Sequence, residues 1–202
     1  MPSERKHAAK RFQANASMLL KAADFSHHQP HNLNARTVAS VLDFIVLRAE
    51  YGVTTDREFA RWWDAFDGLL PRSAYQYLIP EQGVRLQAEW LCELLSYGTA
   101  PELACALDVE QGSPSAESLL EWLAYVELHT GKTPLVYGSS SFLDALKLPS
   151  EFARYPLWLA DYRATPIVPR PWDDWTWLQH TSKGTLPGVT GNVDLYWGRR
   201  LA

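Results

Sequence analysis

The residues best placed to do chemistry are two carboxylates, Asp108 and Glu110, two positions apart at the end of the apolar run 103–109. Side chains alternate along a strand, so both acids share a face with Ala104 and Ala106, while Leu, Cys, Leu and Val form the opposite face. The larger apolar face is expected to pack against helices, which turns the small residues and both acids toward the inside of a barrel. Burial and mutual repulsion would then raise the pKa of one carboxyl, as a general acid working near neutral pH requires.

Asp24 and Asp194 extend this pair into a cluster. Asp24 ends the first expected strand and Asp194 lies in the last, and these two strands are neighbours if the barrel closes. An isolated Asp-x-Glu is common on protein surfaces, and an Asp at a strand end often caps the next helix. Acids at several matching strand positions instead favour a catalytic site at the carboxyl end of a parallel barrel.

Aromatic residues make up 12% of the chain, with nine Trp and nine Tyr. Tyr75 and Tyr77 share a face of one expected strand, Tyr137 ends another, and Trp158 and Tyr162 share a face of a third. Such rings stack on the flat apolar faces of sugars. Core packing explains Tyr75 and Trp158 equally well, so the sequence favours a carbohydrate groove and leaves this alternative open.

Composition excludes several classes of function. The chain has 19 Lys and Arg against 23 Asp and Glu, and this formal charge of −4 offers no positive surface for nucleic acid or an anionic membrane. No run approaches the roughly 18 apolar residues of a membrane span, so no membrane insertion is expected. Cys92 and Cys105 lie in apolar runs and are expected to be buried thiols rather than a disulfide.

Other chemistries lack their motifs. His27 and His28 are adjacent and point apart, and without a His-Glu-x-x-His or Cys-x-x-Cys partner they predict no metal site. The segment 138–141 lacks the Gly-x-Ser-x-Gly elbow of serine hydrolases, and no Gly-rich phosphate loop is present. We therefore expect neither a metal nor an organic cofactor.

Apolar runs of strand length alternate with helical spacing, which predicts an α/β fold around a parallel sheet. The expected strands, about eight as a closed TIM-type barrel needs, are 20–25, 44–49, 74–79, 103–109, 135–137, 157–160, 176–180 and 193–197. Helices are expected after the N-cap candidates Asp56 and Ser115, over 82–97 and from Ser139.

After the fifth strand, the stretches 150–156, 163–175 and 181–192 hold Pro, Gly and Thr rather than a helical stripe. The sequence therefore predicts an irregular TIM-like (β/α) barrel, with about five βα units followed by about three strands without crossover helices. Residues 1–22 are expected to form an N-terminal helical extension, and residues 23–202 a single catalytic barrel domain.

Four motifs follow one another along the chain: DFSHHQ at 24–29, LDVE at 107–110, WLA at 158–160 and GVTGNVD at 188–194. Their order and spacing resemble glycoside hydrolase family 25, the Chalaropsis-type lysozymes, from about residue 23 to the C-terminus. Each motif alone is weak, and the ordered set is strong.

The resemblance implies a lysozyme, a β-1,4-N-acetylmuramidase that cuts peptidoglycan between N-acetylmuramic acid and N-acetylglucosamine. It makes Glu110 the general acid, and Asp108 a residue that orients the 2-acetamido group or helps to activate water. Asp24 and Asp194 would tune and position both. The residues implied to line the sugar groove are Tyr75, Tyr77, Tyr137, Trp158 and Gln179.

The chain departs from the commoner family pattern at several places. The sequence Arg-Ala-Glu-Tyr-Gly at 48–52 replaces Lys-Ala-Thr-Glu-Gly. Leu178 stands where many members have Trp, and Tyr196 stands where an Asn often follows the last Asp by two positions.

Two other functions fit the same residues. Acid pairs two positions apart on a barrel strand also serve chitinase-like, substrate-assisted glycosidases, and a Trp-rich groove alone would suit a catalytically silent glycan-binding barrel. Because no signal peptide or wall-binding module is recognised, the chain is expected to stay in the cytoplasm until it is released to the cell wall, as a phage-type endolysin does. Peptidoglycan glycan strands are its expected partners, and it is expected to be a monomer.

Overall fold

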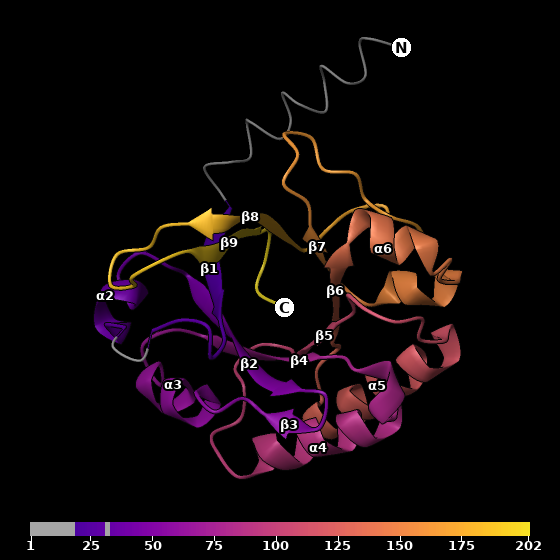
Figure 1. Ribbon diagram of the computed structural model, residues 1–202, viewed down its shortest axis with the longest axis horizontal. Helices are drawn as coiled ribbons and strands as arrows, with labels where there is room; N and C mark the ends of the chain where they lie inside the picture. Colours follow the sequence, from indigo (N-terminus) through magenta and orange to yellow (C-terminus); the bar gives the residue numbers. More distant parts are fainter. Residues whose placement is uncertain (1–18, 31–32) are drawn as a thin grey trace.

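Apolar strands close into a barrel in the computed structural model, which describes residues 19–30 and 33–202 (Figure 1). The strands are β1 Leu20–Phe25, β2 Phe44–Tyr51, β3 Thr54–Thr55, β4 Arg72–Tyr77, β5 Ala106–Asp108, β6 Leu135–Ser139, β7 Leu157–Ala160, β8 Trp177–Gly184 and β9 Val193–Gly198. Every predicted strand is present, and the short β3, which extends the end of β2, was not predicted.

The direction of the strands fixes where a site can form. Pairing is parallel from β1 through β2, β4, β5, β6 and β7 to β8. The last strand, β9, runs antiparallel to both its neighbours, β8 and β1, and so closes the barrel. The carboxyl ends of the parallel strands and the beginning of β9 therefore lie at one end of the barrel, which we call the mouth.

Helices cover the barrel from outside, as Figure 1 shows. They are α2 Ala35–Ala39, α3 Phe59–Ala65, α4 Val84–Ser96, α5 Ala116–Thr130 and α6 Ser140–Ala145, with 3-10 turns η2 Pro80–Gln82 and η3 Ser150–Arg154. In the described chain, only loops without helices connect β7 to β8 and β8 to β9. The predicted irregular α/β barrel, with βα units first and helix-free strands last, is confirmed.

Helix caps were predicted with mixed success. The Ser115 side chain accepts a hydrogen bond from the backbone N–H of Ser118, and Ser139 caps α6 in the same way. Asp56, expected to cap the helix through Phe59, does not: α3 follows Glu58, which makes no side-chain cap bond. The Oδ1 atom of Asp56 accepts the backbone N–H of Glu58 just ahead of α3, and its Oδ2 atom is directed to other partners, described below.

The core has two layers, one inside the barrel and one between the sheet and the helices. Ala104 and Ala106 belong to the inner layer, and Cys105, Leu107 and Val109 to the outer layer, as alternation along a strand requires. Leu103 was expected on the outer face and instead belongs to the inner layer. The reason is that regular strand geometry begins only at Ala106, so the alternation does not extend back to residue 103.

Three other predictions concern the chain as a whole. Of the expected helical extension 1–22, residues 1–18 lie outside the described residues, and residues 20–22 begin β1, where they pair with β9. Cys105 is a buried free thiol, as expected, and Cys92 is free but only partly buried. Among the described helices, none has the length and apolar character needed to cross a membrane.

Candidate active site

Four carboxylates meet at the mouth of the barrel. Asp24 near the end of β1 and Asp194 near the beginning of β9 are direct cross-strand partners. Asp108, the last residue of β5, lies level with Tyr77 of β4 and Tyr137 of β6, and Glu110 follows two positions later. The neighbouring positions that the sequence predicted for the first and last strands are confirmed.

The four acids differ in their access to solvent. Asp24 and Asp108 are buried, with 8% and 5% of their surface exposed. Asp194 is half-buried and Glu110 is exposed at the rim. Among the described residues, Asp108 Oδ1 is one of the few buried side-chain atoms with no hydrogen-bond partner. A buried acceptor without a partner is costly, and protonation of the carboxyl reduces that cost, which agrees with the raised pKa of Asp108.

Burial raises the pKa of every one of these acids. For Asp24, repulsion by Asp194 and Glu110 adds to the effect of burial, and for Asp108 repulsion by Glu110 and Asp24 does so. Burial also raises the pKa of Glu110, which a hydrogen bond with Tyr137 lowers in part. The cluster therefore retains protons at a pH where isolated carboxyls would be ionised, which is the condition for general acid catalysis.

Gln179 joins two sides of the mouth. Its amide oxygen accepts a hydrogen bond of 2.6 Å from the Tyr137 hydroxyl, and its amide nitrogen lies 3.1 Å from the Tyr162 hydroxyl. Burial raises the pKa of Asp194, and a hydrogen bond from Gln179 lowers it. Gln179 thus links the tyrosine beside Glu110 to the fourth acid.

The aromatic residues form a floor and a rim. Trp158, with only 2% of its surface exposed, lies inside the barrel with its ring centroid 4.5 Å from that of Tyr137 and 6.0 Å from that of Tyr75. Its indole Nε1 is a second buried polar atom without a hydrogen-bond partner in the described chain. Tyr77 lies higher, stacked on Tyr51 at 4.8 Å and 16°. Substrate contact by these rings stays a prediction.

Sequence reasoning missed a cation at this mouth. Arg48 lies on β2 between the loops that follow β1 and β3, and its guanidinium binds Asp56, with Nε 2.9 Å and Nη2 2.8 Å from Oδ2. His27 contacts the same pair through Nδ1. The signal was present in the sequence, because Arg48 continues the alternating inner face of Phe44 and Val46.

Glu50 lies on the other face of the same strand and does not belong to the mouth. A bulge between Arg48 and Glu50 turns it under α4, where Gln76 donates a hydrogen bond to its Oε2. Burial raises the pKa of Glu50 to about 7, against a partial lowering by that hydrogen bond. Glu50, which departs from the commoner family pattern, therefore lies in the outer layer of the core, between the sheet and α4, and not in the mouth.

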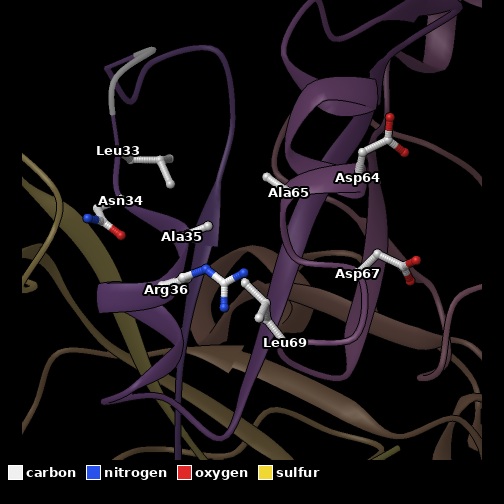
Figure 2. Close-up of a pocket in the computed structure, with 8 residues that line it drawn as sticks. All are labelled: Leu33, Asn34, Ala35, Arg36, Asp64, Ala65, Asp67 and Leu69. Atoms are coloured by element: carbon white, nitrogen blue, oxygen red, sulfur yellow. The ribbon is translucent and has the colours of Figure 1, made fainter.

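A hollow of about 590 Å³ lies away from the mouth, between α2 and α3 (Figure 2). Figure 2 shows Arg36 extending toward Leu69, with Asp64 and Asp67 on the facing segment. None of the predicted site residues lines it. Nowhere in residues 19–30 and 33–202 do three or more His, Cys, Asp and Glu form an arrangement that could hold a metal ion. The acidic mouth is the stronger candidate for the active site.

Comparison with known proteins identifies the family of the chain. The family described as "Glycosyl hydrolases family 25" matches residues 23–189. The protein YegX of Escherichia coli K12, described as uncharacterized, is 33% identical over 164 residues, which is 76% of this chain and 58% of YegX. The chain thus spans little more than half the length of this curated relative.

Solved structures share the fold. A bacterial lysozyme from Streptomyces coelicolor superposes with a TM-score of 0.79 at 22% identity, covering 91% of this chain and 93% of the lysozyme. The Clostridium perfringens spore cortex lytic enzyme SleM gives a TM-score of 0.77 at 27% identity, covering 90% of this chain and 67% of SleM.

Proposed function

This chain belongs to glycosyl hydrolase family 25, and from that membership we propose that it is a lysozyme that hydrolyses the glycan strands of peptidoglycan. The bond cut is the β-1,4 linkage between N-acetylmuramic acid and N-acetylglucosamine. The observation that carries the proposal is the cluster of Asp24, Asp108, Glu110 and Asp194 at the barrel mouth, in which burial raises the pKa of every member.

Glu110 is the general acid. It is the most exposed of the four, so it can reach a glycosidic oxygen, and its raised pKa keeps a proton available. Glu110 donates this proton to the leaving oxygen as the bond to the sugar carbon breaks. Water then adds to that carbon and gives up a proton, which restores the acid.

Asp108 and Trp158 form the floor under the reacting sugar. Asp108 offers an unpartnered carboxylate oxygen, and Trp158 offers an unpartnered indole N–H. An amide carries one acceptor and one donor, so this pair suits a 2-acetamido group. Asp24 and Asp194 adjust the charge of the cluster, and Gln179 holds Asp194 and Tyr137 in place.

Mass spectrometry of the muropeptides released from purified peptidoglycan tests the proposal, with borohydride reduction of the new ends and Glu110→Gln as the inactive control. Reducible ends on muramic acid are expected. Reducible ends on glucosamine, or cleavage of chitin oligomers in preference to peptidoglycan, would favour the chitinase-like alternative. Glycan binding without release of fragments would favour the silent binding barrel.

The enzyme is proposed to act as a monomer, which is supported by the origin of the acids and the surrounding rings in a single chain. Analytical ultracentrifugation at the assay concentration checks this. Retention in the cytoplasm until release to the cell wall stays a prediction, and fractionation of producing cells before and after lysis tests it.

A further inference from the structure

Arg48 is a buried cation on the inner face of the barrel, at the level of the mouth. Its cross-strand partner on β4 is Tyr75, and only 6% of its surface is exposed. Asp56 fixes the guanidinium through the two contacts described above. His27 donates its backbone N–H to the same carboxylate oxygen, at 3.0 Å, and accepts from the guanidinium on its ring nitrogen. The position of this charge is therefore set by two loops.

Strand register places Arg48 beside two of the acids. Asp24 pairs with Val46, two positions before Arg48 on the same face, and Tyr75, the partner of Arg48, pairs with Ala106, two positions before Asp108. The positive charge of Arg48 acts on some acids of the cluster and not on others. It lowers the pKa of Asp24 and of Asp108, against the larger effects of burial and like charges. For Glu110 the causes are burial, the Tyr137 hydrogen bond and Asp194. Arg48 thus favours the ionised form on the β1 and β5 side of the mouth and leaves the proposed proton donor largely unaffected.

Other groups also face these acids from the elements around them. The titratable and charged ones are Asp24, His27, His28, Arg48, Tyr51, Asp56, Tyr75, Tyr77, Asp108, Glu110, Tyr137, Tyr162, Asp194 and Tyr196. The His27 ring nitrogen accepts from Arg48, and burial lowers the pKa of His28, so Arg48 is the permanent cation in this set. Its direct ion-pair partner is Asp56, and its charge acts on Asp24 and Asp108 without an ion pair to either.

Resting on the proposed hydrolase function, we propose that Arg48 is a positioning residue that keeps one carboxylate of the Asp24 and Asp108 pair ionised during catalysis. Glycoside hydrolysis with two carboxyl roles needs a protonated acid and an ionised partner at the same pH. Asp56 and His27 hold Arg48 where its charge favours the ionised form of this aspartate pair and leaves Glu110 protonated.

The test compares pH–rate profiles of Arg48→Gln and Arg48→Lys with that of the unchanged chain. The neutral Gln lets the pKa of the ionised aspartate rise. The acid limb of the pH profile of kcat/KM therefore moves to higher pH by about one pH unit. On that limb the rate falls roughly tenfold, while the basic limb stays in place. Arg48→Lys retains the positive charge, so its acid limb should lie at the pH of the unchanged chain, although Lys lacks the planar guanidinium group.

Arg72→Gln is the matched control, because Arg72 is also a buried arginine but lies at the beginning of β4, away from the mouth, and binds Glu102. It is expected to lower stability and to leave both limbs unchanged. The inference would be overturned if the acid limb of Arg48→Gln coincided with that of the unchanged chain, or if Arg48→Gln and Arg72→Gln shifted it equally. The muramidase proposal would stand in either case.

A second measurement does not depend on activity. NMR titration of the aspartate side-chain carboxyl carbons follows the ionisation of Asp24 and Asp108 directly. Higher midpoints in Arg48→Gln than in Arg48→Lys are expected, and equal midpoints would refute the role of the charge. If the unchanged chain releases no muropeptides but these midpoints still differ, the proposed function fails and the electrostatic role of Arg48 remains.

Discussion

Replacing Glu110 by Gln should remove activity and leave the protein at least as stable as before. Gln has the same shape but no proton to donate, so the loss of general acid catalysis should lower kcat by about 10²–10⁴-fold, or about 3–5 kcal/mol of transition-state stabilisation. Glu110 lies at the exposed rim, where its substitution disturbs little packing.

The gain in stability follows from the charge of the cluster. Glu110 raises the pKa of Asp24 and Asp108 by repulsion. An acid whose pKa is raised by folding stabilises the protein fully below its unfolded pKa and loses that contribution as pH rises. At neutral pH, repulsion among the ionised acids lowers the free energy of unfolding. Removing the Glu110 charge should raise that free energy by on the order of 0.5 kcal/mol, after discounting for solvent screening. This corresponds to an increase in Tm of about 1–2 °C.

The assay pairs initial rates of reducing-end release from purified cell walls with Tm from differential scanning fluorimetry. Glu102→Gln is the control, because Glu102 binds Arg72 at the far end of the barrel, with Oε1 2.7 Å from Nη2. It should lower Tm by about 2–4 °C and keep the rate. Our reasoning is refuted if Glu110→Gln retains more than about a tenth of the activity, or loses activity together with stability.

Three further outcomes are expected. Tyr137→Phe removes a hydroxyl that lowers the pKa of Glu110, so the acid keeps its proton longer and the basic limb of the pH–rate profile should move to higher pH. Burial raises the pKa of Glu50 to about 7 in the folded protein, so its stabilising contribution is complete below the unfolded value of 4.5 and is lost as pH rises through 7. Glu50→Gln should therefore remove about 2–3 kcal/mol from the pH dependence of the free energy of unfolding. Urea denaturation at about pH 5 and about pH 8 measures this difference. Tyr77→Ala removes a ring stacked on Tyr51 and should raise KM about fivefold with little change in kcat, as expected for the loss of one aromatic contact of about 1 kcal/mol; an unchanged KM would remove Tyr77 from the sugar groove.

Much of the fold could be predicted because its signals are local. The strands β1 and β7 have the predicted bounds. The apolar run of β7 is limited by Pro156 and Asp161. The strand β5 is shorter than predicted. Leu103 donates its backbone N–H to Arg72 and Ala104 donates to Ala202, so distant segments determine where the regular ladder begins. The helix α2 was missed because it buries only Val38 and has no apolar stripe.

The inward positions of the acids and of Arg48 could be predicted from strand alternation, and the partners of Arg48 could not. Side chains alternate along β5, so the sequence alone predicts that Asp108 points to the inside of the barrel, on the same face as Ala104 and Ala106. The partnership of Arg48 with Asp56 and His27 depends on how the loops after β1 and β3 meet β2, which no local pattern encodes. Asp56 also has the local appearance of a helix cap, and its actual partner lies eight residues earlier in the chain.

The reversed direction of β9 determines how the molecule could be attached to a surface. Because β9 leads the chain back to the beginning of β1, where Gly198 pairs with Leu20, the described chain starts and finishes on the side away from the mouth. A bead or electrode coupled ahead of β1 would hold the molecule with its acids facing the bulk solution. Coupling at Ala202 would be less suitable, because this residue packs against the inner layer and its carbonyl accepts the N–H of Ala104.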